Sequence, residues 1–423
     1  MMTGTEAKTG GATDARELRA FVMALFFIFG GITSLNDVII PKLKDLFALD
    51  HMQAMLVQSA FFAAYFIVSL PGAALVRRLG YMRGATVGLI LMLAGCLLFV
   101  PVSSHPTFIL FLLALFVLAS GVTIVQVVAN PLISLLGAPE TAHSRLTFAQ
   151  AFNSLGTTIF PYFGSILILG KLADVSTSSL SGAALDAYRA AESQAVAHAY
   201  LGLAAALAVV AGAVWLHRDR LQEEHHAQGP MFAGFGLLKR PRFGFGAASI
   251  FLYVGAEVAI GSLIVLYLEQ AQVLGLDEQS AGKLIPLYWG GALVGRFIGS
   301  GVLRLASPGK ALAVHALGAA ALIAISANST GALAGYSLLA IGLMNSIMFP
   351  TIFSLASEGL GERAAEGSGI ICVAIVGGAV IPPLTGRIAD LSGSLSLSLA
   401  LPALCYLVIA AFGIYARKPA EAS

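Results

Sequence analysis

Long apolar segments alternate with short polar segments along almost the whole chain. A helix needs about 20 apolar residues to cross the hydrocarbon core of a bilayer, because its backbone must satisfy its own hydrogen bonds there. Twelve segments meet this criterion, at about residues 20–40, 54–76, 83–101, 107–136, 146–170, 194–216, 243–268, 282–303, 310–327, 332–357, 366–387 and 394–416. The pattern therefore predicts an all-α membrane protein with twelve transmembrane helices.

The longest polar stretch between spans covers residues 217–242 and divides the spans into two sets of six. It predicts five regions: a tail (1–19), a six-helix half (20–216), a linker (217–242), a second half (243–416) and a tail (417–423). If the N-terminus is inside, seventeen Lys and Arg residues lie on the cytoplasmic side and six toward the outside. Because basic residues favour the cytoplasmic side, both termini and the linker are expected there.

The two halves repeat each other. Matching residues recur in order at offsets between 219 and 227 positions, among them Pro131 with Pro350, Gly156 with Gly377, and Pro161 with Pro382. Two six-helix halves in parallel orientation form the architecture of the major facilitator transporters, whose substrate site lies between the halves near the bilayer midplane. The sequence thus predicts a major facilitator fold with two pseudo-symmetric halves.

The composition of the chain excludes several classes of protein. Hydrophobic residues make up 58% of the chain and charged residues 11%, whereas soluble domains carry about 25% charged residues. This excludes an ordinary cytosolic enzyme, a disordered chain and a nucleic-acid-binding protein. The three cysteines lie in apolar segments, the histidines lack zinc spacing, and no nucleotide-binding loop or catalytic grouping is visible. We expect no enzymatic activity, no cofactor and no metal.

Two carboxylates fall inside predicted spans. Asp37 in the first span follows Asn36 and precedes three apolar residues and a proline, and Glu257 lies near the centre of the seventh span. A charge at the membrane centre costs about 3 kcal/mol on insertion scales, so such residues point to function. We predict proton coupling at both carboxylates, and sugar contact at Asn36 and Glu257. The alternatives are a hydrated structural carboxylate at Asp37 and a structural ion pair between Glu257 and Arg296.

Side-chain amides cluster on two adjacent spans. Gln126 and Asn130 are four residues apart, and Gln150 and Asn153 are three apart, so each pair shares one helical face. Amides both donate and accept hydrogen bonds, which suits a ring of hydroxyl groups better than an ion. These residues are predicted to bind substrate; the alternative is polar contact between helices, worth about 0.6 kcal/mol per bond.

Other candidates are less specific. Tyr288, Trp289 and Asn345 could contact a sugar, or serve packing alone. Four arginines are candidate gating residues: Arg77, Arg78, Arg296 and Arg304. Arg77, Arg78 and Arg304 lie at the predicted cytoplasmic end and also fit a topology signal, whereas Arg296 lies in the interior.

Several stretches resemble the fucose/glucose/galactose–proton symporters of the major facilitator superfamily. They are SLND (34–37), QSAFF (58–62), ANP (129–131), QAFNSLG (150–156) and FPTIFSL (349–355). The resemblance implies proton-coupled uptake of a monosaccharide through a bacterial inner membrane, with Asp37 as the proton-linked carboxylate and Gln150 and Asn153 holding hydroxyls. Fucose-specific members carry a glutamate where this chain has Gln126, which points to glucose, galactose or a related hexose.

The expected partners are a monosaccharide, a proton and the lipid bilayer, without nucleic acid, and the expected state is a monomer. The main alternative within transporters is a proton-independent facilitator or exporter of a sugar or another small polar metabolite. A membrane sensor or embedded enzyme is disfavoured because the chain shows duplicated halves and no catalytic cluster.

Overall fold

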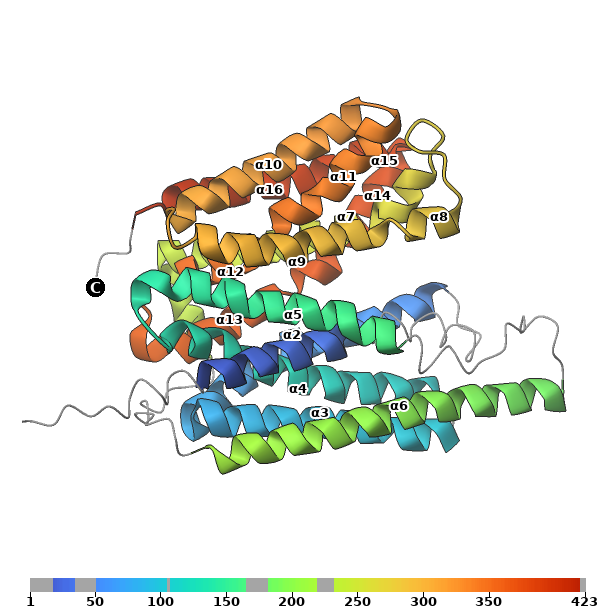
Figure 1. The fold of residues 1–423 in the computed structure, drawn as a ribbon, viewed down its shortest axis with the longest axis vertical. Helices are drawn as coiled ribbons and strands as arrows, with labels where there is room; N and C mark the ends of the chain where they lie inside the picture. Colours follow the sequence, from blue (N-terminus) through green and yellow to red (C-terminus); the bar gives the residue numbers. More distant parts are fainter. Residues whose placement is uncertain (1–17, 35–50, 105–106, 165–181, 219–231, 419–423) are drawn as a thin grey trace, which may run out of the picture.

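The computed structural model describes residues 18–34, 51–104, 107–164, 182–218 and 232–418, and all regular elements in these ranges are helices (Figure 1). The first half contains a helix over Leu18–Ser34. It is followed by α2 (His51–Leu79), α3 (Tyr81–Ser104), α4 (Phe108–Leu135), η1 (Pro139–Thr141), α5 (Ala142–Gly164) and α6 (Ala183–Leu216).

The second half begins with η4 (Ala233–Lys239) and α7 (Pro241–Glu269). It continues with α8 (Glu278–Gly282), α9 (Ile285–Val302), α10 (Pro308–Asn328), α11 (Gly331–Asn345), α12 (Met348–Ser357), η5 (Gly361–Arg363), α13 (Ala364–Ala374), α14 (Gly377–Ser392), α15 (Leu395–Ser398) and α16 (Ala400–Tyr415). Each of the twelve predicted spans therefore contains helix.

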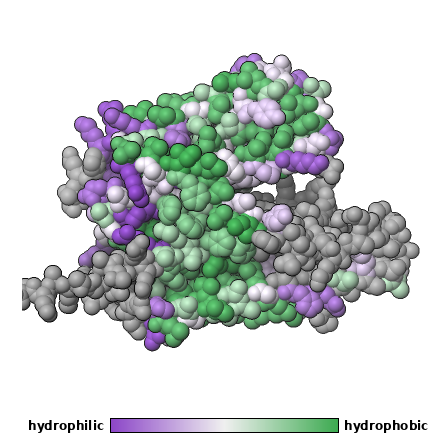
Figure 2. Space-filling view, in the orientation of Figure 1, coloured by the Kyte–Doolittle hydropathy of each residue, from purple (hydrophilic) through white to green (hydrophobic). Residues whose placement is uncertain are grey.

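Among the described residues, eight helical stretches are long and apolar enough to cross a membrane. The remaining predicted spans correspond to Leu18–Ser34, α5, α6 and the α8–α9 pair. Polar residues are tolerated in α5 and α9 because these two helices pack against each other inside the protein. Figure 2 shows a wide apolar band around the middle of the molecule with hydrophilic residues toward its ends, as a bilayer requires.

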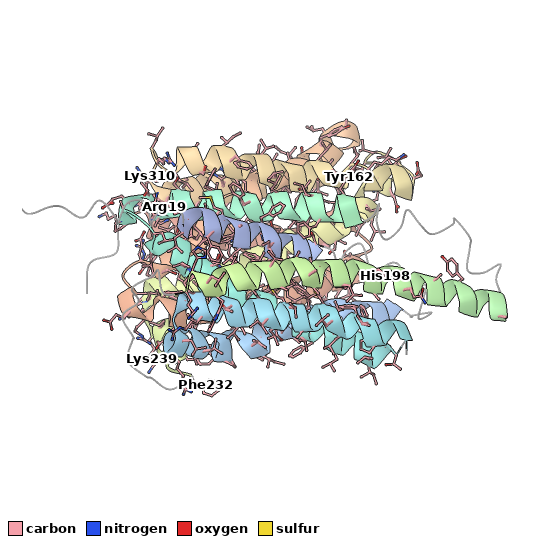
Figure 3. The ribbon with its side chains drawn as sticks, turned by 60° about the horizontal axis from the view of Figure 1, so that its bottom comes forward. Arg19, Tyr162, His198, Phe232, Lys239 and Lys310 are labelled. Carbon is pink, nitrogen blue, oxygen red and sulfur yellow. The ribbon has the colours of Figure 1, made fainter. Side chains whose placement is uncertain are left out.

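The two halves form two helical layers that meet along α5 and α9 and along α2 and α13 (Figure 1). In Figure 3, Arg19, Lys239 and Lys310 lie at one end of the bundle and Tyr162 lies toward the other. These three basic residues all belong to the end that the charge distribution predicts to be cytoplasmic. We call this end of the bundle the cytoplasmic end, after that prediction.

Two of the differences between the helices and the predicted spans have a clear physical cause. Helix α6 begins at Ala183, whereas the apolar pattern predicts a start near residue 194. Its first turns are alanine-rich, and alanine favours helix whether or not the segment is apolar. In addition, the predicted span 332–357 is interrupted, because α11 ends at Asn345 and α12 begins at Met348.

The interruption between α11 and α12 has a local cause. Pro350 has no N–H, so it cannot form the hydrogen bond that a continuous helix would make to the carbonyl of Ser346. The Ser346 carbonyl instead accepts a hydrogen bond from Arg296 Nε at 3.2 Å. The break therefore exposes a backbone acceptor deep inside the second half.

Close packing of α9 on α11 fixes the position of this break. A Cβ on Gly342 would lie 1.9 Å from the Tyr288 carbonyl oxygen, and a Cβ on Gly295 would lie 2.5 Å from Ser346 Cβ. Only glycine permits the two backbones to approach this closely. This contact brings Tyr288 and Arg296 of α9 beside Asn345 and Ser346.

Candidate functional site

The amides of the first half meet at the contact between α4 and α5. Gln150 Nε2 donates to Asn130 Oδ1 at 3.3 Å, and both side chains are buried. Asn130 Nδ2 and Gln126 Oε1 are also buried, and neither has a hydrogen-bond partner in the structure. Because an unsatisfied buried polar group costs about 1–3 kcal/mol, these two atoms mark hydrogen-bonding capacity suited to a polar ligand.

Asn153 lies one turn farther along α5, against the first helix. Its Nδ2 donates to the Phe26 carbonyl at 3.3 Å. A Cβ on Gly156 would lie 2.1 Å from the Phe27 carbonyl oxygen, so glycine is needed for this close approach. The predicted residues Asn36 and Asp37 lie outside the described residues, which stop at Ser34 in this part of the chain.

A second polar cluster surrounds Glu257 on α7. The Tyr253 hydroxyl donates to Glu257 Oε1 at 2.7 Å and lies 3.1 Å from the Asn345 carbonyl oxygen. The Tyr288 hydroxyl donates to the Glu257 carbonyl at 3.1 Å and accepts from Asn345 Nδ2 at 2.8 Å. Tyr406 of α16 donates to Asn345 Oδ1 at 2.8 Å. Glu257 is thus held through both its side chain and its backbone.

The geometry separates residues that can contact a ligand from residues that position them. Both side-chain atoms of Asn345 are engaged by tyrosine hydroxyls, and Asn345 and Tyr288 are almost completely buried. Trp289 is half-exposed and packs edge-to-face on Tyr288, with ring centroids 5.0 Å apart. Glu257, which is partly exposed, and Trp289 can therefore contact a ligand, whereas Asn345 and Tyr288 position them.

Sequence reasoning missed Tyr253 and Tyr406. Tyr253 carries a detectable signal, because it precedes Glu257 by four residues and so shares its helical face. Tyr406 carries none, since it reaches Asn345 only through the packing of α16 against α7 and α10.

Arg296 of α9 lies between the two polar clusters. Its Nη1 donates across the interface to the Gln150 carbonyl at 3.2 Å and to Ser154 Oγ on α5. Its Nε donates to the Ser346 carbonyl, next to Asn345. Arg296 forms no ion pair with Glu257, although the two charges attract each other at longer range. The structure therefore contradicts the alternative of a direct Glu257–Arg296 pair.

At the cytoplasmic end, charged side chains join the halves. Arg77 at the end of α2 forms a buried ion pair with Glu366 of α13, and Arg363 also pairs with Glu366 at 2.8 Å. Arg78, also predicted as a gating residue, is exposed. The Arg304 side chain is exposed but reaches the first half, because its Nε donates to Ser144 Oγ at 3.2 Å.

His143 makes a further contact between the halves that sequence reasoning missed. Its Nδ1 lies 2.5 Å from Ser354 Oγ and its Nε2 lies 3.1 Å from Glu358 Oε1. Arg242 binds the other oxygen of Glu358. Glu366 lies at the start of the predicted eleventh span and pairs with Arg77 at the end of α2. Glu358 lies just after the tenth span. Acidic residues at these positions, in a region rich in basic residues, were the available signal.

Within the parts of the chain that the structure describes, no group of three or more His, Cys, Asp or Glu side chains is placed to hold a metal ion. Arg296 links α5, at the Gln150 carbonyl and the Ser154 hydroxyl, to the Ser346 carbonyl beside Asn345. A helical membrane protein of two halves with polar residues at their interface has the architecture of a solute transporter.

Comparison with known proteins agrees with this class. The profile of the Major Facilitator Superfamily matches residues 22–383. The glucose/galactose transporter of Brucella abortus is 50% identical over 395 residues, covering 93% of this chain and 92% of that protein. The L-fucose-proton symporter of Escherichia coli K12 is 33% identical over 421 residues, covering 96% of each chain.

A solved structure matches as well. The crystal structure of FucP, a major facilitator transporter in the outward conformation, superposes with a TM-score of 0.88 at 31% identity, covering 96% of this chain and all of that one. The chain belongs to the major facilitator superfamily, and within it to the fucose/glucose/galactose–proton symporter family. It is a multi-pass membrane transporter rather than an enzyme, which confirms the predicted class and fold.

Proposed function

We propose that this protein is a proton-coupled symporter that imports glucose, galactose or a related hexose by alternating access. The observation that carries the proposal is the arrangement of two polar clusters on either side of Arg296. One supplies buried amide atoms without partners, and the other supplies an oriented carboxylate. The names of the relatives, a glucose/galactose transporter and a fucose-proton symporter, support a sugar as the substrate.

In this proposal the sugar hydroxyls bind the amides of the first half, chiefly Gln126, Asn130 and Gln150. Asn153 contributes from the contact between α5 and the first helix, and Asn36 is assigned the same role from the sequence. From the second half, Glu257 accepts a hydroxyl hydrogen bond and Trp289 packs on the apolar face of the ring. Amides and a carboxylate together can bind both the donor and the acceptor of each hydroxyl group.

Proton coupling is assigned to Asp37, with Glu257 as the second candidate. A protonated carboxylate is neutral, so a loaded carrier can move it through the protein interior at lower cost than an ionised one. Proton and sugar would then cross together, because reorientation is favoured only when the charge has been neutralised.

Alternating access requires the cytoplasmic end to open and close. The contacts Arg77–Glu366, His143–Glu358 and Arg304–Ser144 join the halves at this end, so the described conformation corresponds to a carrier closed toward the cytoplasm. Arg77, Arg296 and Arg304 would release their partners during opening, while Arg78 would act on topology alone. We assign both termini to the cytoplasmic side of a bacterial inner membrane and treat the monomer as the working unit.

The main test distinguishes symport from facilitated diffusion or export. Sugar is added to de-energised cells that produce the protein, and the pH of a weakly buffered medium is recorded. Symport predicts an alkaline shift as protons enter with the sugar. Sugar entry without any such shift would overturn proton coupling and favour the facilitator.

The substrate requires a separate measurement. Purified protein is screened for binding of hexoses, deoxyhexoses and amino sugars. The proposal expects glucose and galactose to bind more tightly than L-fucose. A preference for L-fucose would contradict the assignment based on Gln126.

A further inference from the structure

The hydroxyl of Tyr253 lies between two acceptors. Glu257 Oε1 is 2.7 Å away and the Asn345 carbonyl oxygen is 3.1 Å away. A phenol has a single proton to donate, so it can serve only one of these acceptors well at any time. The state of Glu257 decides between the two acceptors, because the phenol proton can go to Glu257 only when its carboxyl oxygen is able to accept it.

The other hydroxyls around Glu257 have fixed directions. Tyr288 accepts from Asn345 Nδ2, and its own proton goes to the Glu257 carbonyl. Tyr406 donates to Asn345 Oδ1. Arg296 is the charged group that acts on Glu257 from α9, and its Nε is engaged by the Ser346 carbonyl. Tyr253 is therefore the member of the cluster that can change partner without breaking another bond.

We propose that Tyr253 is a hydroxyl switch that transmits the protonation state of Glu257 to the break between α11 and α12. When Glu257 is ionised, the Tyr253 proton is donated to its carboxylate. When Glu257 takes up the coupling proton, its new O–H donates to Tyr253 Oη, and the Tyr253 proton turns to the Asn345 carbonyl. Glu257 gains one proton, and the tyrosine O–H only rotates.

The receiving carbonyl is well placed to act on the interface between the halves. Asn345 is followed by Ser346, whose carbonyl is free of the helix because Pro350 lacks an N–H. That carbonyl holds Arg296, and Arg296 holds the backbone of Gln150 and the hydroxyl of Ser154 on α5. A stronger hydrogen bond to the Asn345 carbonyl thus acts on the backbone one residue before Ser346. Ser346 is the residue through which Arg296 links α11 and α9 to α5, the helix proposed to bind sugar.

This inference rests on the proposed proton-coupled transport. It is tested in proteoliposomes with the Tyr253→Phe variant, comparing sugar accumulation driven by a proton gradient with sugar counterflow at equal pH. Accumulation should fall about tenfold, as expected for loss of a hydrogen bond to a charged group. Counterflow should fall clearly less than accumulation, because exchange at equal pH needs no change in the protonation of Glu257. Tyr267→Phe is the matched control, because it removes another buried hydroxyl of α7, one that bonds Ser326 instead.

The outcomes distinguish a failure of the proposed function from a failure of the hydroxyl switch. If wild-type protein takes up sugar without protons, the proposed function is wrong. If the wild type is coupled and Tyr253→Phe accumulates sugar normally, or loses counterflow and accumulation equally, the switch is wrong.

A double variant and a spectroscopic readout test the link between Tyr253 and Glu257 directly. Glu257→Gln places an amide N–H where the protonated carboxyl would donate, so it fixes Tyr253 toward Asn345. In that background, adding Tyr253→Phe should lower accumulation by less than about twofold further, instead of the roughly tenfold expected when Glu257 is present. Infrared spectra offer a direct readout, since the C=O band of protonated Glu257, absent in Glu257→Gln, should shift in Tyr253→Phe. An unshifted band would overturn the switch.

Discussion

Arg77 and Glu366 come from opposite halves of the molecule and form a buried ion pair, with 2.5 Å between Nη1 and Oε1. Glu366 also binds Arg363 within its own half. The carboxylate therefore keeps one cationic partner when the halves separate at the cytoplasmic end, whereas Arg77 loses this partner. The pair can hold the cytoplasmic end closed without leaving Glu366 unpaired in the open state.

We expect Glu366→Gln to favour opening of the cytoplasmic end. Breaking a buried pair by removing one partner costs about 3–5 kcal/mol, because the remaining charge stays buried without compensation. A single cysteine placed at Ser354 should then react faster with a membrane-impermeant thiol reagent added from the cytoplasmic side. The background for this measurement replaces the three native cysteines, which are all buried.

Arg78→Gln is the matched control for this measurement. Arg78 is the exposed neighbour of Arg77, and exposed charges contribute about 0–1 kcal/mol. The labelling rate should stay close to that of the parent. Equal rates in Glu366→Gln and Arg78→Gln would contradict a gating role for the pair.

Gln150→Ala should weaken sugar binding about tenfold, through loss of hydrogen bonds to the sugar and to Asn130. The chain has two tryptophans, so Trp215→Phe leaves Trp289 as the single fluorescent reporter beside Glu257's cluster. A titration of its fluorescence gives the dissociation constant. Asn328→Ala, which removes an exposed amide on α10, should leave binding unchanged, and an equal loss in both variants would argue against the amide site.

Asp37→Asn should abolish proton-driven accumulation while leaving part of the sugar exchange, because the amide mimics the protonated carboxyl and cannot release a proton. Accumulation and counterflow of labelled sugar are measured side by side in cells. Normal concentrative uptake by this variant would contradict the assignment of Asp37 as the proton-linked carboxylate.

Gly342→Ala should destabilise the second half. The new Cβ would lie 1.9 Å from the Tyr288 carbonyl oxygen, and backbone cannot move away cheaply, so the cost is about 1–3 kcal/mol or more. Gly290→Ala is the control, since a Cβ there meets nothing within 4 Å. The midpoint of thermal unfolding in detergent should fall for the first variant and stay equal or rise for the second.

Helical periodicity predicted how some of the amides are arranged. The four-residue spacing of Gln126 and Asn130 and the three-residue spacing of Gln150 and Asn153 indicate shared faces, and Gln150 does meet Asn130 across α4 and α5. Helical geometry alone gives this information, because residues three or four positions apart lie on the same side. Periodicity did not predict that the Asn345 amide bonds two tyrosines, Tyr288 and Tyr406.

The sequence by itself determined the class of the protein, the helical spans, the duplicated halves and the few polar groups inside the membrane. These follow from local properties, since a segment is either apolar enough to span hydrocarbon or it is not. Only the tertiary structure decided that Arg296 tethers α5, that Arg77 pairs with Glu366, and that Tyr253 lies between Glu257 and Asn345. Such pairings depend on the rotation and depth of each packed helix, which glycines such as Gly342 fix by close contact with distant backbone.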